Sequence, residues 1–385
     1  MFALLSLFGI LQAVAGLICV RGFVRRPGAV PAERPPLTVL KPVCGAEPML
    51  EQALASFVEQ SYPTFQIVFG AHHEDDAAVA VARGLQARFP DSDIAVIVDA
   101  TQHGANRKIG NLLNMLPHAK HDVLVFADSD LHVAPDYLDR VVAGLETPGT
   151  GLVTTIYTAA PAVAGLPARL GATHLTHSFL PGALLGFALG RQDCLGTTMA
   201  LHRATLDRLG GLHRLAPHLA DDYLLAKMVR QLGLDVRLAD TVPVTTVQDA
   251  SFAGLWRHEL RWARTMSALE PVTVAGATLQ YPIVWAALAI LCAGGAAWAF
   301  VAFALAWAVR ALAGVAVSRS LRRVAARAPE PPPVWLLPFR DVLSAVQIVA
   351  SYWTDDVVWR GYRLRADTAG DAFRAETASL SPEEI

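Results

Sequence analysis

The chain has 385 residues, of which 53% are hydrophobic and only 17% are charged, and its mean hydropathy is +0.37. Soluble domains carry about 25% charged residues, so this deficit excludes a disordered chain and indicates membrane segments beside a soluble part. The 32 basic residues nearly balance the 34 acidic ones. Because nucleic-acid-binding proteins usually have a basic excess, we expect no nucleic-acid partner. The four cysteines have neither CxxC nor zinc-ligand spacing.

The first expected element is an apolar helix at the N-terminus. Residues 2–20 carry no charge, and at about 1.5 Å per residue they would cross roughly the hydrocarbon thickness of a bilayer. A cleaved signal peptide would have a basic start, whereas here Arg21, Arg25 and Arg26 follow the apolar run. We predict a transmembrane anchor over 1–20, with the chain after Arg21 starting in the cytoplasm.

Residues 36–270 contain no long apolar run and are expected to form one soluble domain. Short apolar strands alternate with helical patterns, which predicts an α/β fold with a mostly parallel sheet covered on both faces. Ligands bind beyond the carboxyl ends of the strands in such sheets. The expected strands are 37–40, 66–71, 94–98, 123–127 and 151–157, and the expected helices are 47–60, 77–89, 108–116 and 135–145.

A second apolar region follows the soluble domain. Residues 272–309 carry no charge and are about long enough for two spans, with a turn near Gly294 and Gly295. We predict a transmembrane hairpin over 272–318. Arg310 would then lie inside the second helix, which is costly unless its side chain snorkels or faces protein.

The last part of the chain is expected to return to the membrane surface. Residues 334–353 contain Pro338, Arg340 and Asp341, so they make a poor span. We interpret them as an interfacial or re-entrant helix. The arginine-containing segment 354–385 is expected to be a cytoplasmic tail.

Acidic residues follow two of the expected strands. Asp76 ends the cluster after the second strand, and Asp128 and Asp130 follow the fourth. Two carboxylates this close repel unless a cation or proton lies between them, and oxygen ligands suit Mg²⁺ or Mn²⁺. The alternative is a pair of helix-capping aspartates. The position directly after a buried strand favours the metal site.

Two further residues stand at expected helix starts. Lys108 opens a helix, where a lysine and the helix N-terminus together suit an anion; a solvated surface lysine is the alternative. Asp222 follows Asp221 in the first turn of another helix, where the helix dipole stabilises a carboxylate. Asp222 is therefore a candidate general base, and simple capping is an equally strong interpretation.

A helix just before the hairpin carries His258, Arg261 and Trp262. Arginine suits phosphate oxygens and tryptophan offers a stacking face, although both residues also favour membrane interfaces. His174 and His177 lie three residues apart and could form a metal pair. We prefer an amphipathic membrane-facing segment there, because no carboxylate lies beside them and Pro181 is expected to break the helix.

These motifs, in this order, resemble the ceramide glucosyltransferase family, an inverting branch of the GT-A glycosyltransferases. They also resemble the bacterial hopanoid-biosynthesis glycosyltransferases of that branch. The likeness extends from Thr38 to Trp262, and the apolar hairpin after it fits too. The matching stretches are TVLKPVCGAEP (38–48), SFVEQSYP (56–63), HHEDDAA (72–78), GANRKIGNL (104–112), FADSD (126–130), CLGTTMALHR (194–203), LADDYLLAK (219–227) and HELRW (258–262).

The resemblance implies a GT-A (nucleotide-diphospho-sugar transferase) fold and a role for each matching residue. Asp222 would be the catalytic base. The others would bind the donor: Asp76 its base and ribose, Lys108 its nucleotide end, and Asp128 and Asp130 a metal and the sugar diphosphate. Arg261 and Trp262 match the end of the family's (Q/R)xxRW signature, whereas His258 replaces Gln or Arg at its first position.

The resemblance also implies the reactants and the location. The donor would be a UDP-sugar, the cofactor Mn²⁺ or Mg²⁺, and the acceptor a hydroxyl of a membrane lipid. The expected place is the inner (plasma) membrane of a bacterium, with the catalytic domain in the cytoplasm. Transfer of N-acetylglucosamine to a hopanoid polyol is slightly favoured by HELRWART at 258–265, and transfer of glucose to ceramide stays open.

Other functions remain compatible with the sequence. A processive polysaccharide synthase has the same sheet and motifs, but usually more spans. A metal-dependent nucleotidyltransferase would release pyrophosphate. A membrane transporter or scaffold is a non-enzymatic alternative, which the large soluble block and its two acidic clusters disfavour.

Overall fold

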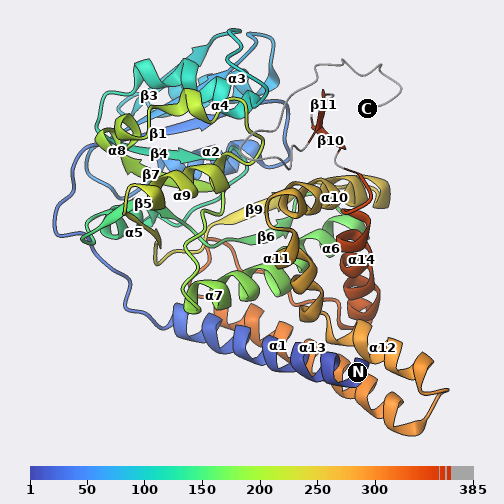
Figure 1. Cartoon of the computed structure of the whole chain (residues 1–385). Coiled ribbons are helices and arrows are strands. Elements are labelled where there is room, and N and C mark those ends of the chain that lie inside the picture. The colour runs from blue at the N-terminus through green and yellow to red at the C-terminus, as the bar shows by residue number, and fades with distance from the viewer. Residues whose placement is uncertain (355, 360–361, 366–385) are drawn as a thin grey trace.

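The computed structural model describes residues 1–354, 356–359 and 362–365 (Figure 1). Most of the expected cytoplasmic tail therefore lies outside the described residues. The described residues form a sheet domain, a group of apolar helices, and a set of connecting helices between them (Figure 1).

The sheet domain is built on a seven-stranded sheet of order β3-β2-β1-β4-β7-β5-β8. β7 is antiparallel to both β4 and β5, and the other neighbouring pairs are parallel. The carboxyl ends of β1, β2, β4 and β5 therefore point to one edge. The strands are β1 Leu37–Pro42, β2 Phe65–Ala71, β3 Asp93–Val98, β4 Val123–Ala127, β5 Thr150–Thr154, β7 Thr198–His202 and β8 Asp235–Leu238.

Helices cover both faces of this sheet. Successive residues of a strand point to opposite faces, so Val125 of β4 joins one core and Phe126 joins the other. The helices on the Val125 face are α2 Leu50–Val58, α3 Ala77–Arg88 and α5 Tyr137–Leu145. Those on the Phe126 face are α4 Arg107–Met115, α8 Arg203–Arg208 and α9 Asp221–Gln231, with the 3₁₀ turns η1 Leu116–His118 and η3 Leu212–Arg214 nearby.

The α/β fold and the mostly parallel sheet predicted from the sequence are confirmed. Most expected boundaries differ from the observed ones by one to three residues, and two of the differences have a local cause or a consequence for the site. The helix expected over 47–60 is α2, and it begins at Leu50 because Met49 adopts a left-handed conformation with φ 66°. The fifth strand ends at Thr154, so Tyr157 lies beyond the strand, at the edge of the sheet.

A smaller two-stranded sheet adjoins the large one. It pairs β6 Thr158–Pro161 in parallel with β9 Val244–Val247. Helix α10 Phe252–Leu269 follows β9. The described C-terminal residues form an antiparallel pair, β10 Asp356–Trp359 and β11 Tyr362–Arg365.

Two helices are long and apolar enough to cross a membrane: α1 Phe2–Val24 and α13 Ala297–Leu321. They pack side by side below the sheet domain (Figure 1). The first helix of the expected hairpin over 272–318 is shorter than predicted. α12 Pro282–Cys292 has 11 residues and spans only about 16 Å. It is bent by 75° from the preceding α11 Pro271–Gly276 and η4 Ala277–Gln280, so a third span requires counting the bent pair as one.

A continuous helical segment lies between the sheet domain and these apolar helices (Figure 1). It runs through α6 Leu166–His174, the π-helical η2 Leu175–Phe179 and α7 Leu180–Ala188. The expectation that Pro181 breaks the helix is therefore wrong. Pro181 stands at the start of α7, directly after the π-helical turn, where its missing N–H is tolerated.

The segment expected to be interfacial forms η5 Val334–Leu336 and α14 Leu337–Ala350. Its charged residues are buried, and Asp341 pairs with Arg310 of α13. Arg310 thus faces protein and does not need to snorkel to the membrane surface, so its charge is tolerated inside the helix.

Candidate active site

The loop that follows β1 connects the two acidic clusters at the sheet edge. Asp76 caps α3, where its Oδ1 accepts hydrogen bonds from the backbone N–H of Ala78 (2.9 Å) and of Gly45 in this loop (2.8 Å). Glu47 of the same loop accepts a hydrogen bond from Ser129 (2.7 Å), the residue between Asp128 and Asp130. The clusters after β2 and β4 are therefore neighbours.

Two lysines hold Asp128. Lys108 Nζ lies 2.7 Å from Asp128 Oδ1 and donates to the carbonyl oxygen of Gly196 (3.2 Å). Lys41 Nζ donates to the backbone carbonyl of Asp128 (2.6 Å) and lies 3.5 Å from the centre of the Phe57 ring. Burial opposes the charge of Lys108, but the carboxylates around it raise its pKa, whereas burial lowers the pKa of Lys41 to about 7.

Asp130 is held by the small sheet. Its carboxylate accepts hydrogen bonds from the Thr245 hydroxyl and the Thr246 backbone N–H, both in β9. Burial, and then the neighbouring Asp128, raise the pKa of Asp130. A carboxyl pair of this kind gains stability when a cation lies between its members.

Asp222 lies in the first turn of α9, directly after Asp221. Lys108 Nζ is 3.8 Å from Asp221 Oδ2, and Asp222 accepts a hydrogen bond from the Tyr223 N–H (2.8 Å). Burial, followed by the charge of Asp221, raises the pKa of Asp222 to about 7. Gly196 allows this approach, because a Cβ there would lie 2.7 Å from Asp222 Oδ2.

The last predicted site residues lie on α10. His258 Nδ1 is 3.1 Å from Asp249 Oδ2, and its ring centre is 4.4 Å from that of Trp262. The Arg261 guanidinium carbon lies 6.0 Å from the Trp262 ring centre. Trp262 also packs in the same apolar cluster as Tyr157.

The structure therefore brings the aspartates predicted from separate motifs to one edge of the sheet. Through the loop after β1, Asp76 is connected to Ser129, the residue before Asp130. Lys108 connects Asp128 to Asp221, the residue before Asp222. Three further residues were not singled out from the sequence, namely Lys41, Tyr157 and Asp221. Lys41 lies in the TVLKP stretch and is one of few lysines, which was the available signal.

Tyr157 extends the site toward the apolar helices. Burial, and then the negative charge of Asp222, raise the pKa of its phenol. Its ring centre lies 5.1 Å from that of Phe179 in η2. Phe179 in turn packs against an apolar cluster that includes Val20 of α1 and Val317 of α13.

The residues at this edge fit a divalent cation that also has non-protein ligands. Within the described part of the chain, no group of three or more His, Cys, Asp or Glu side chains could hold a metal ion. Asp128 and Asp130 offer two carboxylates, and Mg²⁺ or Mn²⁺ commonly completes its shell with phosphate oxygens and water. His174 and His177 are not such a pair, since their rings bond Ser344 (3.5 Å) and Ser318 (2.7 Å) respectively.

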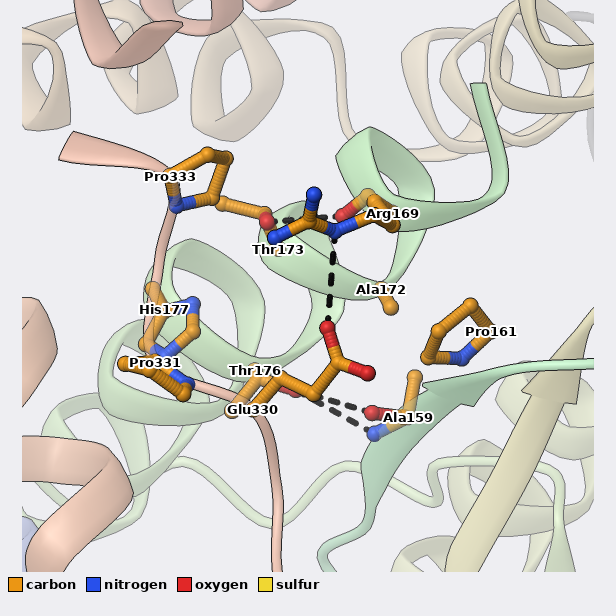
Figure 2. A pocket seen from close by; sticks show the side chains of 10 residues that line it. All are labelled: Ala159, Pro161, Arg169, Ala172, Thr173, Thr176, His177, Glu330, Pro331 and Pro333. Carbon is orange, nitrogen blue, oxygen red and sulfur yellow. Dashed lines mark hydrogen bonds and ion pairs between the residues drawn. The ribbon is translucent and has the colours of Figure 1, made fainter. Parts of the chain in front are cut away.

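A small cavity elsewhere is not suited to a substrate. Figure 2 shows it between β6, α6 and the proline-rich segment 330–333, with Arg169 and Glu330 paired at 3.5 Å beside it. Its volume of about 10 Å³ is roughly that of one water. The sheet edge is therefore the better candidate site.

Comparison with known proteins identifies the family. The family model described as glycosyl transferase family 21 matches residues 1–372. The chain belongs to glycosyl transferase family 21. This agrees with the ceramide glucosyltransferase-like, GT-A assignment made from the motifs.

Two relatives of this family 21 chain show how far the likeness extends. Ceramide glucosyltransferase 1 of Caenorhabditis elegans is 24% identical over 247 residues, which cover 64% of this chain and 53% of the relative. A ceramide glucosyltransferase of Komagataella phaffii is 30% identical over 125 residues, covering 31% and 25% respectively. The chain thus spans about half the length of the nematode relative, and less of the yeast one.

The fold of the family 21 chain has a counterpart among solved structures. The mannosyltransferase PcManGT from Pyrobaculum calidifontis, solved in complex with GDP-Man and Mn²⁺, is similar with a TM-score of 0.50 and 19% identity. The match covers 91% of this chain and 100% of the other. At this identity the likeness supports the GT-A fold alone.

Proposed function

We propose that this family 21 chain is a membrane-bound inverting glycosyltransferase that transfers a sugar from a UDP-sugar to a hydroxyl of a membrane lipid. The observation that carries the proposal is the position of Asp222. It is a carboxyl group with a pKa of about 7, and it follows Asp221, which lies 3.8 Å from the Lys108 Nζ that pairs with Asp128 (2.7 Å). Sheets of this kind bind ligands beyond the carboxyl ends of their strands.

The donor would lie along the loop after β1. Asp76 would hold the base and ribose, next to Gly45. Lys108, at the start of α4, would face the diphosphate, where a lysine and a helix N-terminus favour anions. Asp128 and Asp130 would bind Mn²⁺ or Mg²⁺ together with phosphate oxygens. When bound, such a metal neutralises negative charge on the diphosphate.

The transfer itself needs one base. Asp222 would accept the proton of the acceptor hydroxyl while that oxygen bonds to the anomeric carbon and the bond to UDP breaks. The diphosphate oxygen keeps the bonding electrons, so the products are the glycolipid, UDP and the protonated Asp222. One such displacement inverts the anomeric centre. Arg261 would stabilise the charge that develops on the diphosphate.

The acceptor would come from the bilayer. The charge of Asp222 raises the pKa of Tyr157, which places the two side chains near each other. The Tyr157 ring packs on Phe179, and Phe179 contacts the apolar cluster around α1 and α13. A lipid in the membrane could thus place its hydroxyl near Asp222. A hopanoid polyol receiving N-acetylglucosamine and ceramide receiving glucose both meet this requirement. The arginines that follow α1 favour a cytoplasmic catalytic domain in a bacterial plasma membrane.

The proposal is tested with the full chain in lipid nanodiscs, supplied in turn with UDP-N-acetylglucosamine or UDP-glucose and with a hopanoid polyol or ceramide. We expect one combination of donor and acceptor to give Mn²⁺-dependent release of UDP together with a glycolipid product. Excess EDTA or the change Asp130→Asn should abolish this release. Asp91→Asn, on an exposed residue, is the matched control. No UDP release with any combination would reject the proposal.

The products separate the alternatives. A single added sugar with an inverted anomeric signal in NMR supports inverting transfer to a lipid. Long saccharide products would indicate a processive synthase, and pyrophosphate in place of UDP would indicate a nucleotidyltransferase.

A further inference from the structure

Helix α14 carries two adjacent buried charges of opposite sign. Arg340 is 1% exposed and Asp341 is 0% exposed. Burying an unpaired charge is very costly, so each must find a partner inside the protein. Their partners lie on two different helices, α10 and α13, both of which precede α14 in the chain.

Arg340 pairs with the helix that carries the candidate site residues. Its Nη1 and Nη2 donate to Glu259 Oε1 (3.1 Å) and Oε2 (2.7 Å) of α10. Glu259 is 6% exposed. Ser344 Oγ, 2.7 Å from Nη2, and Gln347 Oε1, at 3.4 Å, complete the surroundings of the guanidinium. A two-point pair of this kind fixes orientation as well as distance.

Asp341 pairs with a candidate membrane span. Its Oδ1 accepts from Arg310 Nη2 (2.9 Å) and its Oδ2 from Arg310 Nε (3.3 Å) of α13. Arg310 also donates to the His177 carbonyl (2.9 Å) and to Ser178 Oγ (3.0 Å) in η2. α14 is therefore bonded both to α10 and to the α13–η2 contact.

The position of Glu259 in α10 gives this connection a consequence. At about 100° per residue, Glu259 points about 60° away from Trp262 and about 160° away from Arg261 around the helix axis. Fixing Glu259 against Arg340 therefore fixes the rotation of α10. That rotation determines where Trp262 and Arg261 point.

A buried ion pair is not by itself a gain in stability. Replacing both members by apolar residues of similar size is often neutral or stabilising, whereas removing one member is costly. Stability alone thus gives no reason for a two-point pair between residues 81 positions apart. Orientation of α10 does.

We propose that Glu259 and Arg340 are positioning residues. They hold α10 so that Arg261 and Trp262 face the sugar nucleotide, and Asp341–Arg310 ties this arrangement to the membrane span. The inference rests on the proposed function, because it assigns donor contacts to α10. It adds that α14 sets donor affinity without touching the donor.

The test compares three changes in full-length protein in nanodiscs: Arg340→Gln, the exchange Glu259→Arg with Arg340→Glu, and the apolar pair Glu259→Met with Arg340→Met. The matched control is the exchange Glu51→Arg with Arg88→Glu. That surface pair has the same 2.7 Å separation but is 62% and 47% exposed. Measured quantities are Tm, KM for the UDP-sugar, kcat, and hydrogen–deuterium exchange of residues 257–265.

We expect Arg340→Gln to raise the donor KM at least tenfold and to speed amide exchange in 257–265. The charge exchange should recover most of the affinity. The apolar pair should keep a wild-type Tm and still show the raised KM, and the surface exchange should change nothing.

Wild-type KM, kcat and amide exchange in the apolar pair would overturn the proposal, because the ion pair would then only fill space. An inactive wild-type protein would reject the proposed function instead. In that case amide exchange in 257–265 still decides whether Arg340 holds α10.

Discussion

At the scale of single residues, neighbouring carboxyl groups of the candidate site have different hydrogen-bond and ion-pair partners. Asp128 contacts Lys108 directly, at 2.7 Å. Asp222 accepts a hydrogen bond from the Tyr223 N–H, and burial, followed by the charge of Asp221, raises its pKa to about 7. A carboxyl group with a raised pKa can accept a proton near neutral pH, which is the role proposed for Asp222.

Asp222→Asn tests the proposed base. The amide keeps the size of the side chain but cannot accept the acceptor's proton, so we expect turnover to fall by about 10²–10⁴-fold while UDP binding persists. Steady-state rates and UDP titration measure the two effects. Turnover near the wild-type value would remove Asp222 from this role.

The pH profile provides a second readout of the same group. A base must be deprotonated to act, so kcat/KM should rise with pH up to about 7 and then level off. Asp222→Asn should lack this limb. Because the pKa of Asp222 is raised in the folded state, its protonation stabilises the fold, and its contribution falls as pH rises from about 4 to about 7.

Gly196→Ala tests the packing around Asp222. Gly196 has φ +79°, and an added Cβ would lie 2.7 Å from Asp222 Oδ2. We expect turnover to fall at least tenfold. Gly190→Ala is the control for backbone strain, since Gly190 has φ +92° with nothing within 4 Å of the added Cβ. Equal losses in both variants would mean that strain, and not displacement of Asp222, is responsible.

At the scale of elements, one side chain serves both a helix and the candidate site. Asp76 caps α3 and also bonds Gly45 in the loop after β1. Capping and donor binding are therefore not exclusive interpretations of an aspartate at a helix start. Separating them requires a variant that keeps the cap and loses the charge.

Asp76→Asn and Asp76→Ala make that separation. Asparagine caps helices about as well as aspartate, while alanine costs about 1 kcal/mol. We expect both variants to bind UDP more weakly, but only Asp76→Ala to have a lower Tm. Unchanged UDP affinity in Asp76→Asn would restrict Asp76 to capping.

The sequence predicts single helices and strands better than it predicts contacts between them. Local patterns were sufficient for strand 123–127, whose bounds the structure reproduces, and for the place of Asp222 in the first turn of a helix. Contacts between distant segments were not. The Thr245 hydroxyl that bonds Asp130 lies 115 positions away, and nothing local to either residue indicates the pairing. Tyr157 was assigned to a strand that ends earlier, which concealed its place at the sheet edge.

At the scale of the whole molecule, the apolar helices form one packed unit with the connecting helices, and Val20 of α1 and Val317 of α13 share an apolar cluster with Leu238 of β8. α1 contacts α13, α12 and α7, and a Cβ added at Gly16 of α1 would lie 3.0 Å from Pro181 of α7. The charged pair Arg310–Asp341 lies inside this unit, at 5% and 0% side-chain exposure. Removing one member therefore leaves the other buried and unpaired.

Arg310→Met should destabilise the protein by about 3–5 kcal/mol, because Asp341 loses its partner. The double change Arg310→Met with Asp341→Leu should recover most of that loss. Thermal unfolding in detergent measures both. A double variant no more stable than Arg310→Met would show that the destabilisation has another cause.

The loop after β1 has a consequence for how two ligands affect the binding of each other. Its Gly45 contacts Asp76 at the proposed nucleoside end, and its Glu47 contacts Ser129 between the two aspartates of the proposed metal site. We expect a ligand that orders one end of this loop to order the other end as well, so a nucleotide and a divalent ion should each increase the affinity of the other by the same factor. Crossed titrations of UDP and Mn²⁺ measure that factor, and a value of one would mean that the two ends act independently.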